Sequence, residues 1–209
     1  MKYLIVCGGK TDKEFGLNEI KTDGIDAIIA ADSGLDFLYE NGVTPDIIVG
    51  DFDSATTKAL EFFERKGQTE IHRLNPIKDD TDTEYAIRLA IREGARSIVM
   101  LGATGSRIDH VLGNISLLGI GLESGTDISI IDTNNRIRMS DKPVTIEKSA
   151  QYGRFVSLIA VTDDNEVSLR GFKYPVTDYS FDRFTSLGIS NEIIDDYACL
   201  LYTSPSPRD

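Results

Sequence analysis

The sequence has few of the residues that build disulfides, histidine metal sites or membrane spans. It contains two cysteines and two histidines in 209 residues. Cys7 and Cys199 form neither a disulfide framework nor a metal-ligand spacing, and two histidines exclude a histidine-rich metal site. No apolar run approaches the roughly 20 residues of a membrane span, and the first apolar segment is too short for a signal peptide. We therefore expect a cytoplasmic protein without a membrane partner.

Basic residues are also scarce. Lysine and arginine number 22 against 34 aspartates and glutamates, which gives a formal net charge of −12. Nucleic-acid binders carry a basic face, so we expect no nucleic-acid partner. A nucleotide substrate is compatible with this charge, because a metal ion can offset the repulsion between carboxylates and a triphosphate. Lys10, Lys78 and Arg107 lie in turns where they could hold part of the remaining charge.

Short apolar strands alternate with amphipathic helices over the first 135 residues. Strands that are buried on both faces read as continuous apolar runs. The expected strands are residues 3–6, 27–30, 47–49, 70–74, 98–101 and 128–131, and the expected helices are residues 35–40, 56–66, 82–93 and 109–123. This alternation predicts an α/β fold, a Rossmann-like domain built on a parallel sheet.

Two of the expected helices have informative sequences. In the third, Thr81 and Glu84 match the capping box and Gly94 provides a stop, so Glu84 has a structural explanation. The fourth contains three interior glycines, Gly113, Gly119 and Gly121. Because each interior glycine costs up to about 1 kcal/mol relative to alanine, we expect this helix to pack closely against a second helix or a dimer partner.

The pattern changes after residue 135 to short alternating segments separated by turn signals. The expected strands there are residues 144–147, 155–160 and 167–170, which predicts a small antiparallel β domain. The last residues are rich in serine and proline and have no apolar period. We therefore divide the chain into an α/β domain (1–135), a β domain (136–201) and a disordered or artefactual tail (202–209).

Five polar or acidic turns follow strands of the predicted parallel sheet. They are residues 31–34, 50–54, 78–82, 102–107 and 132–135. Such turns line one edge of a parallel sheet, so their carboxylates would converge on a single crevice. Clustered carboxylates repel one another unless a cation joins them, and Mg²⁺ prefers carboxylates together with phosphate oxygens. The sequence therefore predicts a divalent-metal site that handles phosphates.

Four aspartates are the predicted metal ligands. Asp51 and Asp53 are spaced to share or bracket Mg²⁺, although Asp53 or its neighbour could instead cap the next helix. Asp79 and Asp82 are the better candidates of the following acidic turn, because Asp80 between them can point into water. A helix N-terminus uses only one of these three acids, and the excess favours the metal.

Residues 102–107 have the physical properties of a phosphate cradle. Small residues expose backbone N–H groups before a helix whose dipole favours anions, and Arg107 can fork onto phosphate oxygens. The segment matches neither standard glycine-rich signature, and residues 8–10 form a second glycine turn. Asp109 could cap the helix, act as a general base or pair with Arg107, whereas we expect His110 to be structural.

In their order along the chain, these segments resemble the thiamine pyrophosphokinase family. The resemblance lies in residues 31–34, 50–54, 78–84 and 102–110, and continues at Leu112, Asn114, Ile115, 171–175 and 190–192. It extends to about Tyr197. It implies a thiamine diphosphokinase, an enzyme that transfers pyrophosphate from ATP to the thiamine hydroxyl and gives thiamine diphosphate and AMP.

The resemblance also implies Mg²⁺, a C-terminal β-sandwich that binds thiamine, and a homodimer with active sites between subunits. It assigns catalysis and metal binding to Asp51, Asp53, Asp79 and Asp82. It assigns ATP binding to Asp32, Ser33, Gly34, Gly105, Ser106, Arg107 and Asp109, and thiamine binding to Ser190 and Asn191. Asp32, or an acid of the second acidic turn, could accept the hydroxyl proton.

The resemblance has one departure and leaves three alternatives open. Family members usually continue after the segment matching 191–198 with another strand, whereas residues 199–201 here run into the serine- and proline-rich tail. A missing strand would leave a sheet edge unpaired. The alternatives are a pyrophosphokinase for a pterin alcohol, an aspartyl-phosphate hydrolase using the acids around Phe52, and a sensor that binds ATP without turnover.

Overall fold

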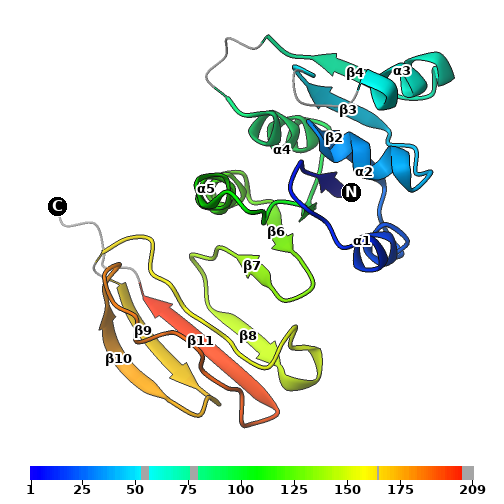
Figure 1. Ribbon diagram of the computed structural model, residues 1–209. Coiled ribbons are helices and arrows are strands. Elements are labelled where there is room, and N and C mark those ends of the chain that lie inside the picture. Colours follow the sequence, from blue (N-terminus) through cyan, green and yellow to red (C-terminus); the bar gives the residue numbers. More distant parts are fainter. Residues whose placement is uncertain (53–56, 76–79, 164, 204–209) are drawn as a thin grey trace. The chain divides into compact units, whose positions relative to one another are not determined.

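The computed structural model describes residues 1–52, 57–75, 80–163 and 165–203. The chain divides into two compact units, Met1–Met139 and Ser140–Asp209 (Figure 1). None of the helices in this described part of the chain is long and apolar enough to cross a membrane.

The first unit contains a mostly parallel seven-stranded sheet in the order β4-β3-β2-β1-β5-β6-β7. Its strands are β1 Lys2–Val6, β2 Ala27–Ala31, β3 Ile47–Gly50, β4 Glu70–Arg73, β5 Ser97–Leu101, β6 Asp127–Ile131 and β7 Arg136–Arg138. The six predicted strands are thus confirmed, each to within one residue at either end. The additional β7 pairs antiparallel with β6, which brings residues 136–138 into this unit.

Helices cover both faces of this sheet. They are α1 Lys13–Ile20, α2 Gly34–Glu40, α3 Thr57–Lys66, α4 Asp82–Arg92 and α5 Ile108–Ser124. The side chains of β1 alternate between two cores. Tyr3, Ile5 and Cys7 pack in the core that includes α4 and α5 residues, whereas Leu4 and Val6 pack with residues of α2 and α3. The predicted α/β architecture is therefore a three-layer one, with Cys7 as an ordinary core residue.

Helix α1 lies in a segment where the sequence predicts none. Asp12 caps it by accepting a hydrogen bond from the Phe15 amide at 2.9 Å. Gly16 lies inside the helix and lowers its intrinsic propensity. A Cβ atom at Gly16 would lie 2.7 Å from Cζ of Phe37 in α2. Gly16, which weakens the helical pattern of the sequence, thus lets α1 pack closely against Phe37.

The ends of α4 largely follow the prediction. The Thr81 hydroxyl accepts a hydrogen bond from the Glu84 amide at 3.1 Å, as a capping residue does. The Glu84 carboxylate is bonded to Arg88, one turn further along the helix. Gly94 follows the helix with φ +90°, a left-handed conformation that glycine adopts without strain. One half of the expected capping box and the glycine stop are confirmed.

The glycines of α5 have different surroundings. A Cβ atom at Gly121 would lie 2.5 Å from the Thr126 carbonyl oxygen and 2.9 Å from Cγ1 of Ile128. Close packing is thus found at Gly121, but with β6 and the turn before it and not with the second helix or dimer partner that the sequence predicts. At Gly113, in contrast, a Cβ atom would meet nothing within 4 Å. Ile108 and Leu112 in the same half of the helix are exposed.

The second unit contains a four-stranded antiparallel sheet in the order β10-β9-β11-β8. Its strands are β8 Val144–Glu147, β9 Asn165–Arg170, β10 Val176–Phe181 and β11 Tyr197–Thr203, and a 3-10 turn, η1 Lys148–Ala150, follows β8. The core of this unit consists of Val167, Leu169, Phe172, Phe181, Ile193 and Ala198.

The prediction of a regular strand at residues 155–160 is wrong. Val156 forms an isolated bridge with Asn191, and the Leu158 amide donates to the Gly188 carbonyl at 2.8 Å. Between these two contacts the partner segment advances three residues, from Gly188 to Asn191, against two from Val156 to Leu158, and Ser190 within it has φ +60°. A continuous ladder cannot form opposite such a segment.

The terminal strand, whose presence the sequence leaves open, is formed by β11. Strand β11 lies between β9 and β8 and pairs with both. Ala198, Leu200 and Tyr202 alternate along it and pack in the core of the second unit. Tyr202, which the sequence assigns to the tail, is paired with Val167. Residues 204–209 lie outside the described part of the chain.

Candidate active site at the carboxyl edge of the parallel sheet

Asp32 is fixed at the carboxyl edge by the close approach of α2 to β1. It directly follows β2 and has φ +51°. A Cβ atom at Gly34 would lie 2.0 Å from the Val6 carbonyl oxygen, so only glycine permits α2 to begin at this position. The Ser33 hydroxyl donates to the Gly8 carbonyl at 3.4 Å. Ser33 and Gly34 thus have a structural role in joining the loops after β1 and β2.

Asp51 directly follows β3. The chain turns sharply at Phe52, which has φ +63°. The Phe52 ring lies over Gly50, where a Cβ atom would be 3.2 Å from Cε1 of the ring, and the Arg73 guanidinium carbon lies 5.4 Å from the ring centroid. These contacts fix the chain immediately after Asp51. The predicted ligand Asp53 lies outside the described residues.

Asp82 is the first residue of α4, immediately after its cap. Because α4 follows β4, which runs parallel to β3, its N-terminus lies at the same edge as the carboxyl ends of those strands. Asp80 is exposed, as predicted. Asp79 and Lys78, which the sequence assigns to metal and charge compensation, lie outside the described residues.

The carboxylates of Asp32, Asp51 and Asp82 come together. Each offers an oxygen atom that lies within 4.8 Å of the other two. Burial raises the pKa of Asp32; a hydrogen bond from the Ser33 amide opposes this rise, and the charges of Asp82 and Asp51 add to it. The convergence expected of the acidic turns is therefore found for these three residues.

The donor set fits a hard divalent cation. Asp32 Oδ1 is buried and has no hydrogen-bond partner among the described residues, which is costly for a polar atom. A cation held by three carboxylate oxygens would supply the missing partner, and Mg²⁺ takes such ligands together with phosphate oxygens. Sequence reasoning placed Asp32 with the ATP contacts. The sequence could have placed Asp32 among the metal ligands, since Asp32 follows β2, the strand next to β3.

The loop after β5 is fixed at its beginning and exposed at its end. The Asn114 side chain donates to the Ala103 carbonyl at 2.8 Å, and the Thr104 hydroxyl donates to Asp132 Oδ2 at 2.7 Å. The next three residues, 105–107, are exposed, and no side chain caps the helix α5 that follows. Backbone N–H groups at such an uncapped helix start attract anions. Asn114 thus supports the loop from the helix.

Arg107 is paired with Asp109. Its guanidinium donates to both carboxylate oxygens, at 2.6 and 3.2 Å. The hydrogen bond from Arg107 lowers the pKa of Asp109. The interpretation of Asp109 as the helix cap is wrong, because α5 begins at Ile108 and Asp109 lies in its first turn. Both side chains are exposed, and exposed ion pairs are weak, so Arg107 can exchange this partner for a phosphate.

Asp132, the acid of the fifth turn, does not join the other carboxylates. Its Oδ1 accepts hydrogen bonds from the Asn134 and Asn135 amides at 2.7 Å each. Burial alone would raise the pKa of Asp132, but the hydrogen bonds from Thr104, Asn134 and Asn135 outweigh it and leave the pKa lowered. This aspartate stabilises a turn.

A small pocket of about 50 Å³ lies where the loops after β1, β5 and β6 meet. Lys10, Thr11 and Gly102 are among the residues that line it. Thr11 Oγ1 is buried and has no hydrogen-bond partner in the described part of the chain. The strand order reverses between β1 and β5, and open α/β sheets bind ligands at such a point. The pocket can accept a phosphate oxygen or a water molecule.

Ser190 and Asn191 belong to the second unit and differ in what they can bind. Asn191 is buried, and its Oδ1 accepts hydrogen bonds from the Tyr174 and Glu192 amides at 3.0 Å. Its Nδ2 donates to the Tyr174 carbonyl at 2.9 Å. The amide therefore holds two backbone segments together. Ser190 is exposed, and its backbone amide donates to Ser157 Oγ.

Of the two histidines, His72 has the contacts of a structural residue. The ring nitrogens of His72 lie 3.1 Å from the Tyr85 hydroxyl and 2.6 Å from a Glu70 carboxylate oxygen. His110 lies exposed in the first turn of α5. Neither is among the residues that could form a metal site in the described part of the chain.

Two family models match the chain. The model for the thiamin pyrophosphokinase catalytic domain matches residues 21–130, and the model for the thiamin pyrophosphokinase vitamin B1 binding domain matches residues 143–204. Among curated proteins, thiamine pyrophosphokinase of Bacillus subtilis is 36% identical over 168 residues, which cover 79% of this chain and 78% of the relative. Thiamin pyrophosphokinase 1 of Caenorhabditis elegans is 24% identical over 160 residues, or 71% of this chain and 63% of the relative.

Solved structures agree with these matches. The crystal structure of the Bacillus subtilis thiamine pyrophosphokinase has a TM-score of 0.85 at 31% identity, covering 97% of this chain and 94% of that chain. The Geobacillus thermodenitrificans thiamin pyrophosphokinase has a TM-score of 0.82 at 30% identity, covering 97% and 93%. Yeast thiamin pyrophosphokinase, at 17% identity, shares the fold with a TM-score of 0.77, covering 96% and 82%.

Proposed function

We infer, because this chain belongs to the thiamine pyrophosphokinase family, that it is a thiamine diphosphokinase. It transfers pyrophosphate from ATP to the hydroxyl group of thiamine, and it produces thiamine diphosphate and AMP. The observation that carries this conclusion is the pair of matches: one family model matches within each compact unit, in the order that the family has.

We propose that Asp32, Asp51 and Asp82 hold Mg²⁺, with Asp53 and Asp79 as further candidates. When bound, the ion neutralises charge on the triphosphate and stabilises the charge that develops during transfer. The support is the convergence of the three carboxylates within 4.8 Å and the unpartnered Asp32 Oδ1. The loops after β2 and β3 and the start of α4 hold these carboxylate oxygens in place.

Phosphate binding is assigned to the other side of the crevice. Gly105 and Ser106 are exposed before the uncapped start of α5, so their N–H groups can receive phosphate oxygens. Arg107 exchanges Asp109 for the substrate and binds it bidentately. Lys10 adds a second cation beside Thr11. Phosphoryl-type transfer depends on positioning and charge neutralisation more than on a nucleophile-base pair, and this set supplies both.

The proton of the thiamine hydroxyl needs an acceptor in the crevice. A carboxylate with a raised pKa is the stronger base. Burial raises the pKa of Asp32, whereas Arg107 lowers the pKa of Asp109. Between these two acids, Asp109 is therefore the weaker acceptor, and Asp32 can take the proton only through a carboxylate oxygen that Mg²⁺ leaves free.

We propose that Ser190 contacts thiamine. Asn191 positions Ser190, since the Asn191 side-chain amide is hydrogen-bonded to the backbone of Tyr174 and Glu192. We also propose a cytoplasmic homodimer. Exposed apolar side chains in both units, Ile108 and Leu112 in α5 and Phe184 and Leu187 in the second unit, support a protein contact. Light scattering on the active enzyme tests this, and an active monomer would contradict it.

Release of AMP from Mg-ATP tests the function. We expect AMP only when thiamine is present, with none above background for a pterin alcohol. AMP with the pterin alcohol alone would establish the first alternative. ATP binding without AMP from either alcohol would establish a sensor. The aspartyl-phosphate alternative is disfavoured because Asp51 follows the third strand in the chain, not the first.

A further inference from the structure

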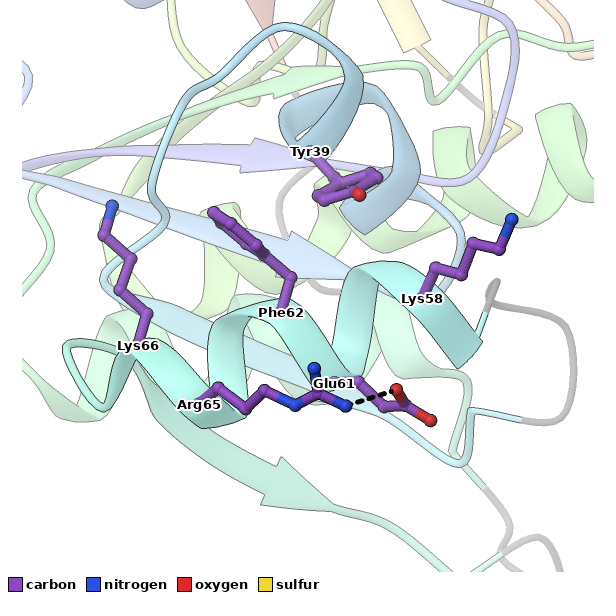
Figure 2. Close-up of a pocket in the computed structure, with 6 residues that line it drawn as sticks. All are labelled: Tyr39, Lys58, Glu61, Phe62, Arg65 and Lys66. Atoms are coloured by element: carbon purple, nitrogen blue, oxygen red, sulfur yellow. Dashed lines mark hydrogen bonds and ion pairs between the residues drawn. The ribbon is translucent and has the colours of Figure 1, made fainter.

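A second pocket lies between α2 and α3, among residues that the proposed active site does not use. It has a volume of about 490 Å³ and is lined by Tyr39 of α2 and by Lys58, Glu61, Phe62, Arg65 and Lys66 of α3 (Figure 2). Small-molecule sites typically have volumes of about 300–1,000 Å³. The pocket is therefore large enough for a ligand of modest size.

The centre of this pocket is an aromatic pair that is held firmly but left exposed. The ring centroids of Tyr39 and Phe62 are 5.2 Å apart, with the ring planes at 63°. Phe62 also contacts Phe63 at 5.1 Å, and Phe63 is fully buried in the core. Even so, Tyr39 is 37% exposed and Phe62 47%. Anchored aromatic rings with free surface provide a platform on which a planar ring can stack.

The platform is flanked by cations. Lys58, Arg65 and Lys66 are the three bases of the pocket and Glu61 is its one acid, in a chain of net charge −12. Figure 2 shows Lys58 and Lys66 on opposite sides of the ring pair. Within the described part of the chain, Lys58 has no hydrogen-bond or ion-pair partner.

The other two cations are partly engaged. Arg65 forms an exposed pair with Glu61 at 3.1 Å. Lys66 donates to the Thr44 hydroxyl at 2.6 Å, and its Nζ lies 6.0 Å from the Phe62 ring centroid. The positive charge that is available to an incoming anion is therefore greatest at the Lys58 end of the platform.

We propose that this pocket is a second ligand site, which binds a nucleoside phosphate with its base on Tyr39 and Phe62 and its phosphate at Lys58. The ligand class follows from the two features together. Inorganic phosphate would leave the aromatic platform unused, and a neutral nucleoside would leave the cations unused. A nucleoside phosphate carries a planar ring and an anion in one molecule.

The helices that line the pocket are connected through the backbone to the proposed active site. Helix α2 begins two residues after Asp32, and α3 is the helix that follows Asp51. A ligand that bridges α2 and α3 therefore contacts the helices that follow two of the three carboxylates. AMP, the product of the proposed reaction, belongs to this ligand class. AMP bound in this pocket can therefore alter the active site as its concentration rises. That regulatory role rests on the proposed function, whereas the binding itself does not.

The test is an NMR titration of the full-length, ¹⁵N-labelled protein. AMP, adenosine and inorganic phosphate are added separately, without metal. We expect AMP to shift the amides of residues 39–42 and 58–67 in a saturable way, with an affinity at least about tenfold higher than either fragment. Phe62→Ala and Lys58→Ala should each weaken AMP binding there at least about tenfold.

Two variants serve as matched controls. Phe184→Ala removes another exposed aromatic ring beside an arginine, in the second unit, and Lys21→Ala removes another exposed lysine. Both should leave AMP binding at α2 and α3 unchanged.

Three results would overturn the proposal. AMP shifts confined to the loops around Asp32 and Gly105 would show that AMP binds the active site alone. Equal responses to AMP and phosphate would remove the role of the aromatic platform, and equal responses to AMP and adenosine would remove the role of the cations. Phe62→Ala and Lys58→Ala should retain wild-type AMP production from thiamine. Absence of AMP production in the wild type would contradict the proposed function and leave the binding result intact.

Discussion

Aspartates lie on both sides of β1 at the carboxyl edge of the parallel sheet, and their surroundings differ. On the β2 and β3 side, three carboxylates lie within 4.8 Å of one another, and Asp32 Oδ1 has no hydrogen-bond partner in the described part of the chain. On the β5 and β6 side, Asp132 accepts several hydrogen bonds and Asp109 is paired with an arginine. The position of an acid after a strand is therefore insufficient to identify a metal ligand, since its neighbours decide whether a cation is needed.

The largest difference between the two sides should appear in catalysis. Asp51→Asn or Asp82→Asn should lower kcat for AMP release at least about 100-fold, on the order of 3 kcal/mol in activation free energy, because a cation ligand is lost. The free energy of unfolding should change by less than about 1 kcal/mol, because the same change relieves carboxylate repulsion. Asp80→Asn, at an exposed acid nearby, is the control. Wild-type turnover in both variants would remove the metal assignment.

Asp132→Ala should instead act on stability. It leaves the Asn134 and Asn135 amides without their acceptor, and an unmet hydrogen-bond group costs about 1–3 kcal/mol of unfolding free energy. Urea denaturation measures this loss. Asp132→Asn keeps an acceptor oxygen and should recover part of it. A fall in kcat as large as that of the Asp82 variant, with unchanged stability, would place Asp132 in the catalytic site.

A smaller effect is expected for Asp32 in the metal-free protein. Burial raises the pKa of Asp32 above its ordinary value of 3.8, so the folded state binds this proton more tightly than the unfolded state does. The contribution of this group to stability is therefore present at low pH, and it is lost as the pH rises through the folded pKa.

Asp32→Asn should accordingly raise the Tm at pH 7 by about 2–4 °C, and the gain should vanish towards pH 3. Added Mg²⁺ should raise the Tm of the wild type and leave that of the variant nearly unchanged. Differential scanning calorimetry at several pH values measures both. An equal Mg²⁺ shift in the two proteins would exclude Asp32 from the site.

The smallest effect should come from the exposed pair on the other side. Arg107→Ala should raise the KM for ATP about fivefold, because a bidentate phosphate contact is lost. The Tm should move by no more than about 1 °C, since an exposed ion pair contributes little. Arg107→Lys keeps the charge without the fork and should recover only part of the affinity. An unchanged KM in Arg107→Ala would show that the pair with Asp109 persists during turnover.

The parallel sheet could be predicted from the sequence almost completely, because strands buried on both faces are continuous apolar runs. Helix α1 could not, since Gly16, which packs closely against Phe37 of α2, lowers the helix propensity of the segment. In the second unit, alternation at residues 155–160 suggested a strand that Gly188 and Ser190 prevent. Strand β11 was missed because its pairing with β9 and β8 outweighs the serine- and proline-rich residues that follow it.

The candidate site was predictable in kind and less so in membership. Asp51 and Asp82 could be proposed because they follow strands or start a helix at the right edge. Asp32 could have been included on the same ground, because it directly follows β2, which pairs with β3. The role of Asn191 depends on hydrogen bonds to Tyr174 and Glu192, which no sequence pattern indicates.

The origin of the three clustered carboxylates has a consequence for the time course of refolding. Asp32, Asp51 and Asp82 reach the crevice on three separate segments, and the strands between them pair in parallel through helical crossovers. Such non-local contacts form late and slowly compared with helices. A cation that needs all three oxygens therefore cannot bind to early intermediates. In a stopped-flow experiment, helical circular dichroism should recover first, and tight divalent-cation binding should return only when β2, β3 and α4 have assembled.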